Sequence, residues 1–106
     1  MPKYLFTGSY TADGARAILK DTAAGRRQAL TAAVEGLGGK VEGLWYAFGD
    51  DDLYALVDLP SNVRAAAISV LVASTGTFAP KIVALLTVDE MDEALKTKVN
   101  FRVAGT

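Results

Sequence analysis

The sequence contains neither cysteine nor histidine, and these two absences exclude much chemistry. Without cysteine there is no disulfide, no thiolate nucleophile, no iron–sulfur cluster and no cysteine-ligated zinc. Without histidine there is no imidazole to serve as a general base near neutral pH, as a metal ligand or in a Ser-His-Asp triad. We therefore expect no metal site and no bound cofactor.

An excess of one charge and long apolar runs are also missing. Eleven Lys and Arg balance 12 Asp and Glu to a net charge of -1, so we expect no nucleic-acid partner. No stretch approaches the roughly 18 apolar residues of a membrane span, and "MPKYLFTGSY" does not resemble a signal peptide. We expect a cytoplasmic protein with no membrane partner, folded as a single domain over residues 1–106.

Apolar periodicity and turn residues predict four strands and three helices. The strands are expected at residues 3–10, 40–48, 53–59 and 78–86. A helix is expected after each of Thr11, Ser61 and Thr87, which are good N-cap residues. The second and third strands are separated by so short a loop that they should form an antiparallel hairpin.

Apolar residues three and four positions apart predict the buried face of each helix. These residues are Ala15, Ile18 and Leu19, then Ala29, Leu30, Ala33, Val34 and Leu37, in the first helix; Val63, Ala67, Val70 and Leu71, with Ile68 and Val72 on the flank, in the second; and Val88, Met91 and Leu95 in the closing helix. Around residues 21–25 the apolar periodicity is interrupted and Gly25 is a poor helix former, so we expect a kink or a short break there.

The order of elements predicts an α+β, ferredoxin-like βαββαβ fold plus a short C-terminal helix, with helices on one face of a four-stranded antiparallel sheet. A sheet with one solvated face should alternate apolar and polar residues, yet "LWYAF" and "LYALV" are apolar almost throughout. Both faces therefore need cover. A second copy packed sheet to sheet would supply it in a homodimer or higher oligomer; a helix folded across the open face is the alternative.

Several stretches resemble the GYD domain family: "YLFTGSYT", "GGKVEGLWYAFGDDD", "VDLP", "NVRAAAISVLV", "STG" and "LLTVDEMDEAL". Its members are small bacterial proteins of largely unassigned function. They are similar to the dimeric α/β-barrel proteins, which include cofactor-free monooxygenases, haem-degrading enzymes and ligand-binding domains. The resemblance implies the fold and the dimer. Gly49 and Asp52 match the family signature, but Asp51 stands where tyrosine is frequent, so no role of a phenol is carried over.

The consecutive acids Asp50, Asp51 and Asp52 are the obvious candidate for a metal site, because hard cations take carboxylate oxygens. However, successive strand residues point to opposite faces, and the alternating acids of an EF-hand loop are absent. Aspartate is also a favoured turn residue. We interpret the three as the turn of the hairpin.

Residues that combine apolar area with a hydrogen-bonding group form the candidate ligand site. They are Tyr4, Thr7, Ser9, Trp45, Tyr46 and Tyr54, with Tyr10 as a further aromatic residue. An ordinary core or a dimer interface is the alternative. Trp45 and Tyr46 must face opposite ways, because they are adjacent in a strand.

Three charged residues are weaker candidates. Asp58 is an acid inside an apolar strand and the only candidate for a catalytic base; the alternative is a strand-end acid bonded to backbone or to the next helix. Arg26 and Arg27 could hold an anionic ligand, but we favour a solvated helix face.

Three functions remain open. The first is a dimeric domain that binds a small apolar or aromatic ligand between sheet and helices. The second is a cofactor-independent monooxygenase or isomerase that would use Trp45, Tyr46 and Asp58. The third is a structural or oligomerisation module.

Overall fold

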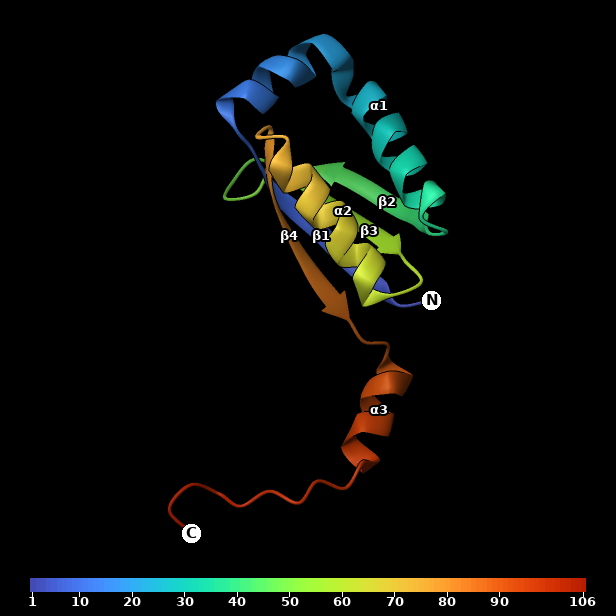
Figure 1. Ribbon diagram of the computed structural model, residues 1–106, viewed down its shortest axis with the longest axis vertical. Coiled ribbons are helices and arrows are strands. Elements are labelled where there is room, and N and C mark those ends of the chain that lie inside the picture. Colours follow the sequence, from blue (N-terminus) through green and yellow to red (C-terminus); the bar gives the residue numbers. More distant parts are fainter.

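A computed structural model describes residues 1–106 and confirms the predicted α+β architecture. The elements are β1 (Lys3–Tyr10), α1 (Ala12–Gly36), β2 (Lys40–Tyr46), β3 (Leu53–Asp58), α2 (Asn62–Ser74), β4 (Phe78–Leu85) and α3 (Val88–Lys96). The four strands form one antiparallel sheet in the order β2-β3-β1-β4. In Figure 1, α2 lies in front of this sheet, while α1 arches over one end of it and runs back beside β2.

The predicted helix starts are confirmed by hydrogen bonds that cap each first turn. The hydroxyl of Thr11 accepts from the backbone N–H of Gly14, and that of Ser61 accepts from Arg64. Thr87 and Glu90 form a reciprocal capping box, in which each side chain accepts from the backbone of the other residue. Each cap satisfies backbone donors that the first turn of a helix leaves free.

The core lies between one face of the sheet and the helices. Its buried apolar residues are Tyr4, Phe6, Val34, Leu53, Ala55, Val57, Leu59, Ala65, Ile68 and Phe78. Phe6 stacks on Phe78 with ring centroids 6.0 Å apart, and the Tyr4 hydroxyl donates to Oδ1 of Asn62 on α2. Because side chains alternate across a strand, these contacts identify the helix-covered face of every strand.

The predicted buried face of α2 is wrong. Val63, Ala67, Val70 and Leu71 are exposed, whereas the buried residues are Ala65 and Ile68, and Ile68 is expected from the sequence only on the flank. The sequence of α2 is apolar on nearly every side, so it has no polar side to set the phase of the periodicity.

The predicted face of the first half of α1 also fails in part. Ile18 is half-buried, but Ala15 and Leu19 are exposed, Leu19 by 83%. This half of α1 arches beyond the end of the sheet (Figure 1), so much of its surface has no strand beneath it. In the second half, Val34 is buried and Leu30 and Leu37 are half-buried, as predicted, whereas Ala29 and Ala33 of the same predicted face are exposed.

The predicted kink in α1 is present at Thr22. Its backbone has φ 69° and ψ 161°, a region that only glycine adopts without strain. The side chain of Thr22 partly offsets this strain, since its hydroxyl accepts a hydrogen bond of 3.2 Å from the backbone N–H of Gly25. Thr22 therefore acts as the N-cap of the second half of the helix.

Replacing Thr22 by glycine should raise the free energy of unfolding by about 1 kcal/mol. The substitution removes backbone strain of about 1–3 kcal/mol, which exceeds the few tenths lost with the cap and the added flexibility of the unfolded chain. Urea denaturation followed by circular dichroism measures the change. Thr31→Gly, in the regular part of α1, is the control and should destabilise the protein. A loss of stability in Thr22→Gly would contradict the strained conformation.

The C-terminal segment, α3 and residues 97–106, projects from the body of the molecule (Figure 1). Val88, Met91 and Leu95, predicted to face inward, are exposed in the single chain, so that prediction is wrong. The radius of gyration is 16.9 Å, against about 13 Å for a compact chain of this length. An amphipathic helix thus remains without a partner in its own chain. No helix is both long and apolar enough to cross a bilayer.

Candidate functional site

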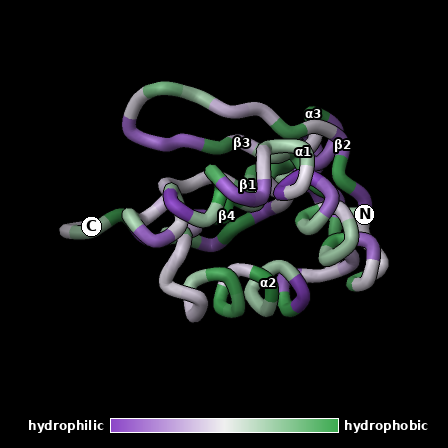
Figure 2. Tube along the Cα trace, turned by 90° about the horizontal axis from the view of Figure 1, so that it is seen from above, coloured by the Kyte–Doolittle hydropathy of each residue, from purple (hydrophilic) through white to green (hydrophobic).

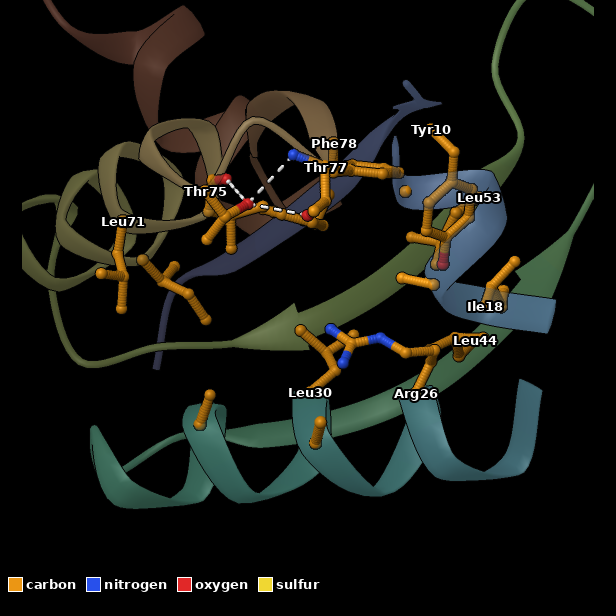
Figure 3. A pocket seen from close by; sticks show the side chains of 17 residues that line it. Tyr10, Ile18, Arg26, Leu30, Leu44, Leu53, Leu71, Thr75, Thr77 and Phe78 are labelled. Carbon is orange, nitrogen blue, oxygen red and sulfur yellow. Dashed lines mark hydrogen bonds between the residues drawn. The ribbon is translucent and has the colours of Figure 1, made fainter. Parts of the chain in front are cut away.

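A cavity of about 350 Å³ lies between the helix-covered face of the sheet and the two helices α1 and α2 (Figure 3). Its size falls within the range of small-molecule sites, about 300–1,000 Å³. Thirteen of its 17 lining residues are hydrophobic, among them Phe6, Leu30, Leu44, Leu53, Ile68 and Phe78. From α1 the lining includes Gly14, Ala17, Ala29 and Ala33, whose small side chains leave the space unfilled.

Tyr10 carries a polar group into one end of this cavity. Its ring packs edge-on against Phe78, with centroids 5.0 Å apart and planes at 73°. Burial, and then the neighbouring Tyr46 hydroxyl, raise the pKa of the Tyr10 phenol, while the positive charge of Arg26 acts weakly in the opposite direction. The phenol therefore stays protonated at neutral pH and can donate a hydrogen bond.

Arg26 is the only charged residue that lines the cavity. Figure 3 shows its guanidinium extending from α1 into the space between this helix and the strands. One nitrogen, Nη1, donates to Oδ2 of Asp21 at 3.2 Å, and this ion pair spans the kink at Thr22. Arg27 instead borders two shallow surface depressions. The two adjacent arginines thus differ in surroundings.

The opposite face of the sheet is not covered by the helices. The strand register places an apolar row across it, formed by Gly43 of β2, Leu56 of β3, Leu5 of β1 and Val83 of β4. Trp45 folds over this row, because a Cβ built on Gly43 would lie 2.3 Å from its indole ring. We call Leu5, Gly43, Trp45, Leu56 and Val83 the open face.

The six residues predicted to bind a ligand are divided between the two faces of the sheet. The register puts Thr7, Trp45 and Tyr54 in one row on the uncovered side, and Ser9 on the same side of β1. Tyr4 and Tyr46 point to the helix-covered side. None of the six lines the cavity; Tyr46 lies beside it as the neighbour of Tyr10.

Two of the predicted polar residues bond to the β2–β3 connection or to the start of β3. The Thr7 hydroxyl donates to the carbonyl of Leu53 in β3, and the Ser9 hydroxyl donates to that of Asp50 in the connection. Both hydroxyl groups are therefore engaged within the chain itself.

Asp58 lies at the end of β3, on the same side as the open face. Its carboxylate accepts a hydrogen bond of 2.9 Å from Nζ of Lys3, which also donates to Glu42 at 2.7 Å. The bond from Lys3 holds the pKa of Asp58 below its usual range. Asp58 is thus bonded to a side chain rather than to backbone or α2. It does not line the cavity, where a base would meet a ligand.

The three aspartates lie in the β2–β3 loop and do not converge on one point. Figure 2 shows this loop projecting from the body, with its hydrophilic stretch immediately before β3. Oδ2 of Asp52 accepts from the backbone N–H of Tyr10 at 2.9 Å, while Asp51 pairs with Lys81 at 3.1 Å. No cluster of three or more acids is placed to hold a metal ion. The contacts connect the loop to β1 and β4.

Sequence reasoning did not select the residues that face the cavity. Phe6 and Tyr10 could have been found from β1 alone, since they share the side of Tyr4 in a strand of period two. The position of Arg26 at the cavity depends on the kink at Thr22. Its neighbour Arg27 has the same side chain, so no local sequence pattern shows which of the two arginines lines the cavity.

Comparison with known proteins identifies one relationship. A family model described as the GYD domain matches residues 4–95, and so covers most of the chain. Searches of curated proteins and of solved structures found no match. The family match agrees with the α+β sheet and helix order found here, and the chain belongs to the GYD domain family.

Proposed function

We propose that this protein is a ligand-binding domain whose cavity holds a small apolar or aromatic molecule. The observation that carries the proposal is the cavity of about 350 Å³, hydrophobic at 13 of 17 lining positions. Such a cavity with a few polar groups is the usual form of a site for a small organic molecule. Its aromatic walls, Phe6, Tyr10 and Phe78, suit a planar ligand.

A neutral fluorescent probe, phenylnaphthylamine, should bind in this cavity and gain fluorescence. Ala33 lines the cavity, whereas its neighbour Ala32 faces a shallow surface depression. Ala33→Phe should fill the space and weaken binding at least about tenfold, a change of about 1.4 kcal/mol. Ala32→Phe adds the same side chain outside the cavity and should leave affinity within about twofold of wild type.

Circular dichroism would confirm that both variants are folded. Equal binding by the two variants would place the probe elsewhere, and absence of binding to wild type would remove the proposed function.

We propose further that two copies associate through their open faces, as a homodimer that can build larger oligomers. Leu56 and Leu5 are only half-buried, while Trp45 and Val83 are 59% and 46% exposed. A contiguous apolar patch of this kind across a sheet is typical of an interface. The ion cluster of Lys3, Glu42 and Asp58 borders it, as a polar rim borders an interface core.

The projecting C-terminal segment also supports a second copy. An isolated helix of nine residues is marginal in water, so α3 needs a surface against which to bury Val88, Met91 and Leu95. Its own chain does not supply one, because α3 leads away from the sheet. Exchange of an element between identical chains is a common way to supply such a surface.

The two alternative functions receive less support. For a cofactor-independent monooxygenase or isomerase, the candidate base Asp58 lies outside the cavity and is paired with Lys3. A structural module would need the open face and α3 but would leave the cavity without a role. The bacterial cytoplasm stays the predicted location.

A further inference from the structure

The polar groups of the cavity are few, and they lie on the side of α1 and β1. Arg26 supplies one positive charge, and Tyr10 supplies a neutral hydroxyl group that neighbours Tyr46. Figure 3 shows both side chains directed into the same space. Thr75 and Thr77, which precede β4, use their hydroxyl groups on each other, and Thr75 also donates to the carbonyl of Val72. A polar ligand group would therefore meet Arg26 and Tyr10 first.

Arg26 has hydrogen-bonding capacity that its own chain does not use. A guanidinium carries five N–H donors in a planar fork, and only Nη1 is engaged, by Asp21 at 3.2 Å. The Arg26 side chain is 44% exposed at the rim of the apolar lining, so water screens part of its charge, and the geometry of the fork rather than desolvation supports the interaction. The free side of the fork matches the two oxygens of a carboxylate.

We propose that the cavity selects apolar molecules that carry one carboxylate, with the acid group on Arg26 and the hydrocarbon or aromatic body against Phe6, Leu44 and Leu53. This inference rests on the cavity function proposed above and specifies the class of ligand. A monoanion fits better than a phosphate dianion, because one guanidinium is present and Asp21 and Asp52 lie nearby. Tyr10 donates a second hydrogen bond to the same carboxylate.

The test compares two competitors of the same shape, naphthoate and naphthamide, which differ in charge. Each displaces phenylnaphthylamine from the full-length protein, and the ratio of their affinities measures the preference for the acid. In wild type the acid should bind about fivefold tighter than the amide, since the ion pair with Arg26 is partly exposed. Arg26→Gln should reduce this preference to about twofold or less, as measured by the ratio of the two affinities within the variant.

Two further variants make the assignment specific. Arg27→Gln removes the same charge one residue away, outside the cavity, and should preserve the preference. Asp21→Asn removes the internal competitor of the ligand and should strengthen binding of naphthoate but not of naphthamide. Equal binding of acid and amide to wild type, or a preference that survives Arg26→Gln, would overturn the inference. The cavity itself would remain established if the neutral probe binds.

Discussion

Gly14→Ala should destabilise the protein by at least about 3 kcal/mol, because the added methyl group meets backbone rather than a movable side chain. A Cβ built on Gly14 would lie 1.8 Å from the carbonyl oxygen of Thr77. That carbonyl is fixed, since it accepts a hydrogen bond of 3.0 Å from the backbone N–H of Thr11. The first turn of α1 is therefore seated directly on the residues that precede β4.

Gly36→Ala provides the matched control at the other end of the same helix. A Cβ on Gly36 has no atom within 4 Å, so alanine should add roughly 0.5 kcal/mol through its higher helix propensity, which counts less at the last residue of the helix than in its interior. Urea denaturation of the two variants should give shifts of opposite sign. An unchanged midpoint for Gly14→Ala would mean that α1 does not rest on Thr77. Because Gly14 and Thr77 both line the cavity, probe binding should fall together with stability in the Gly14 variant.

The second large effect is expected at Leu56, which occupies the centre of the open face. Its neighbours in the row are Leu5 on β1 and Gly43 on β2. In a two-fold symmetric dimer each substitution occurs twice in one interface. Leu56→Lys would thus place two unpaired charges in the apolar centre. Loss of a central contact of this kind costs at least about 2 kcal/mol, or about 30-fold in the dimer dissociation constant.

Light scattering after size-exclusion chromatography should show wild type as a dimer and Leu56→Lys as a folded monomer at micromolar concentration. Val63→Lys is the control. Val63 is an exposed aliphatic residue on α2, away from the open face, so this variant should stay dimeric. A wild-type protein that is already monomeric would contradict the proposed interface.

The sequence allowed the order of elements to be predicted because the residues at the starts of its helices are chemically specific. Thr11, Ser61 and Thr87 can each cap a helix, and all three do. The kink was predictable for the same reason, since the apolar stripe breaks near Gly25, and the structure places the irregular residue at Thr22. These signals are local, so no knowledge of tertiary packing was needed.

The composition of the cavity was not predictable, because it depends on which side of each element meets which neighbour. Aromatic residues occur on both sides of the strands, as Trp45 and Tyr46 illustrate. Only the register and the helix positions assign Tyr10 to the cavity and Trp45 to the open face. The sequence of α2 is apolar almost throughout, so its periodicity did not indicate which side of the helix is buried, and the predicted side was wrong.

The alternation of β1 separates two properties that the strand helps to determine. Phe6 and Tyr10 of β1 point to the cavity, whereas Leu5 of the same strand points to the open face. Under the two proposals made above, a substitution at Phe6 or Tyr10 should change which molecule fits and leave self-association intact, and a substitution at Leu5 should do the reverse. The specificity of the proposed cavity and the proposed subunit assembly would then be separable within one strand.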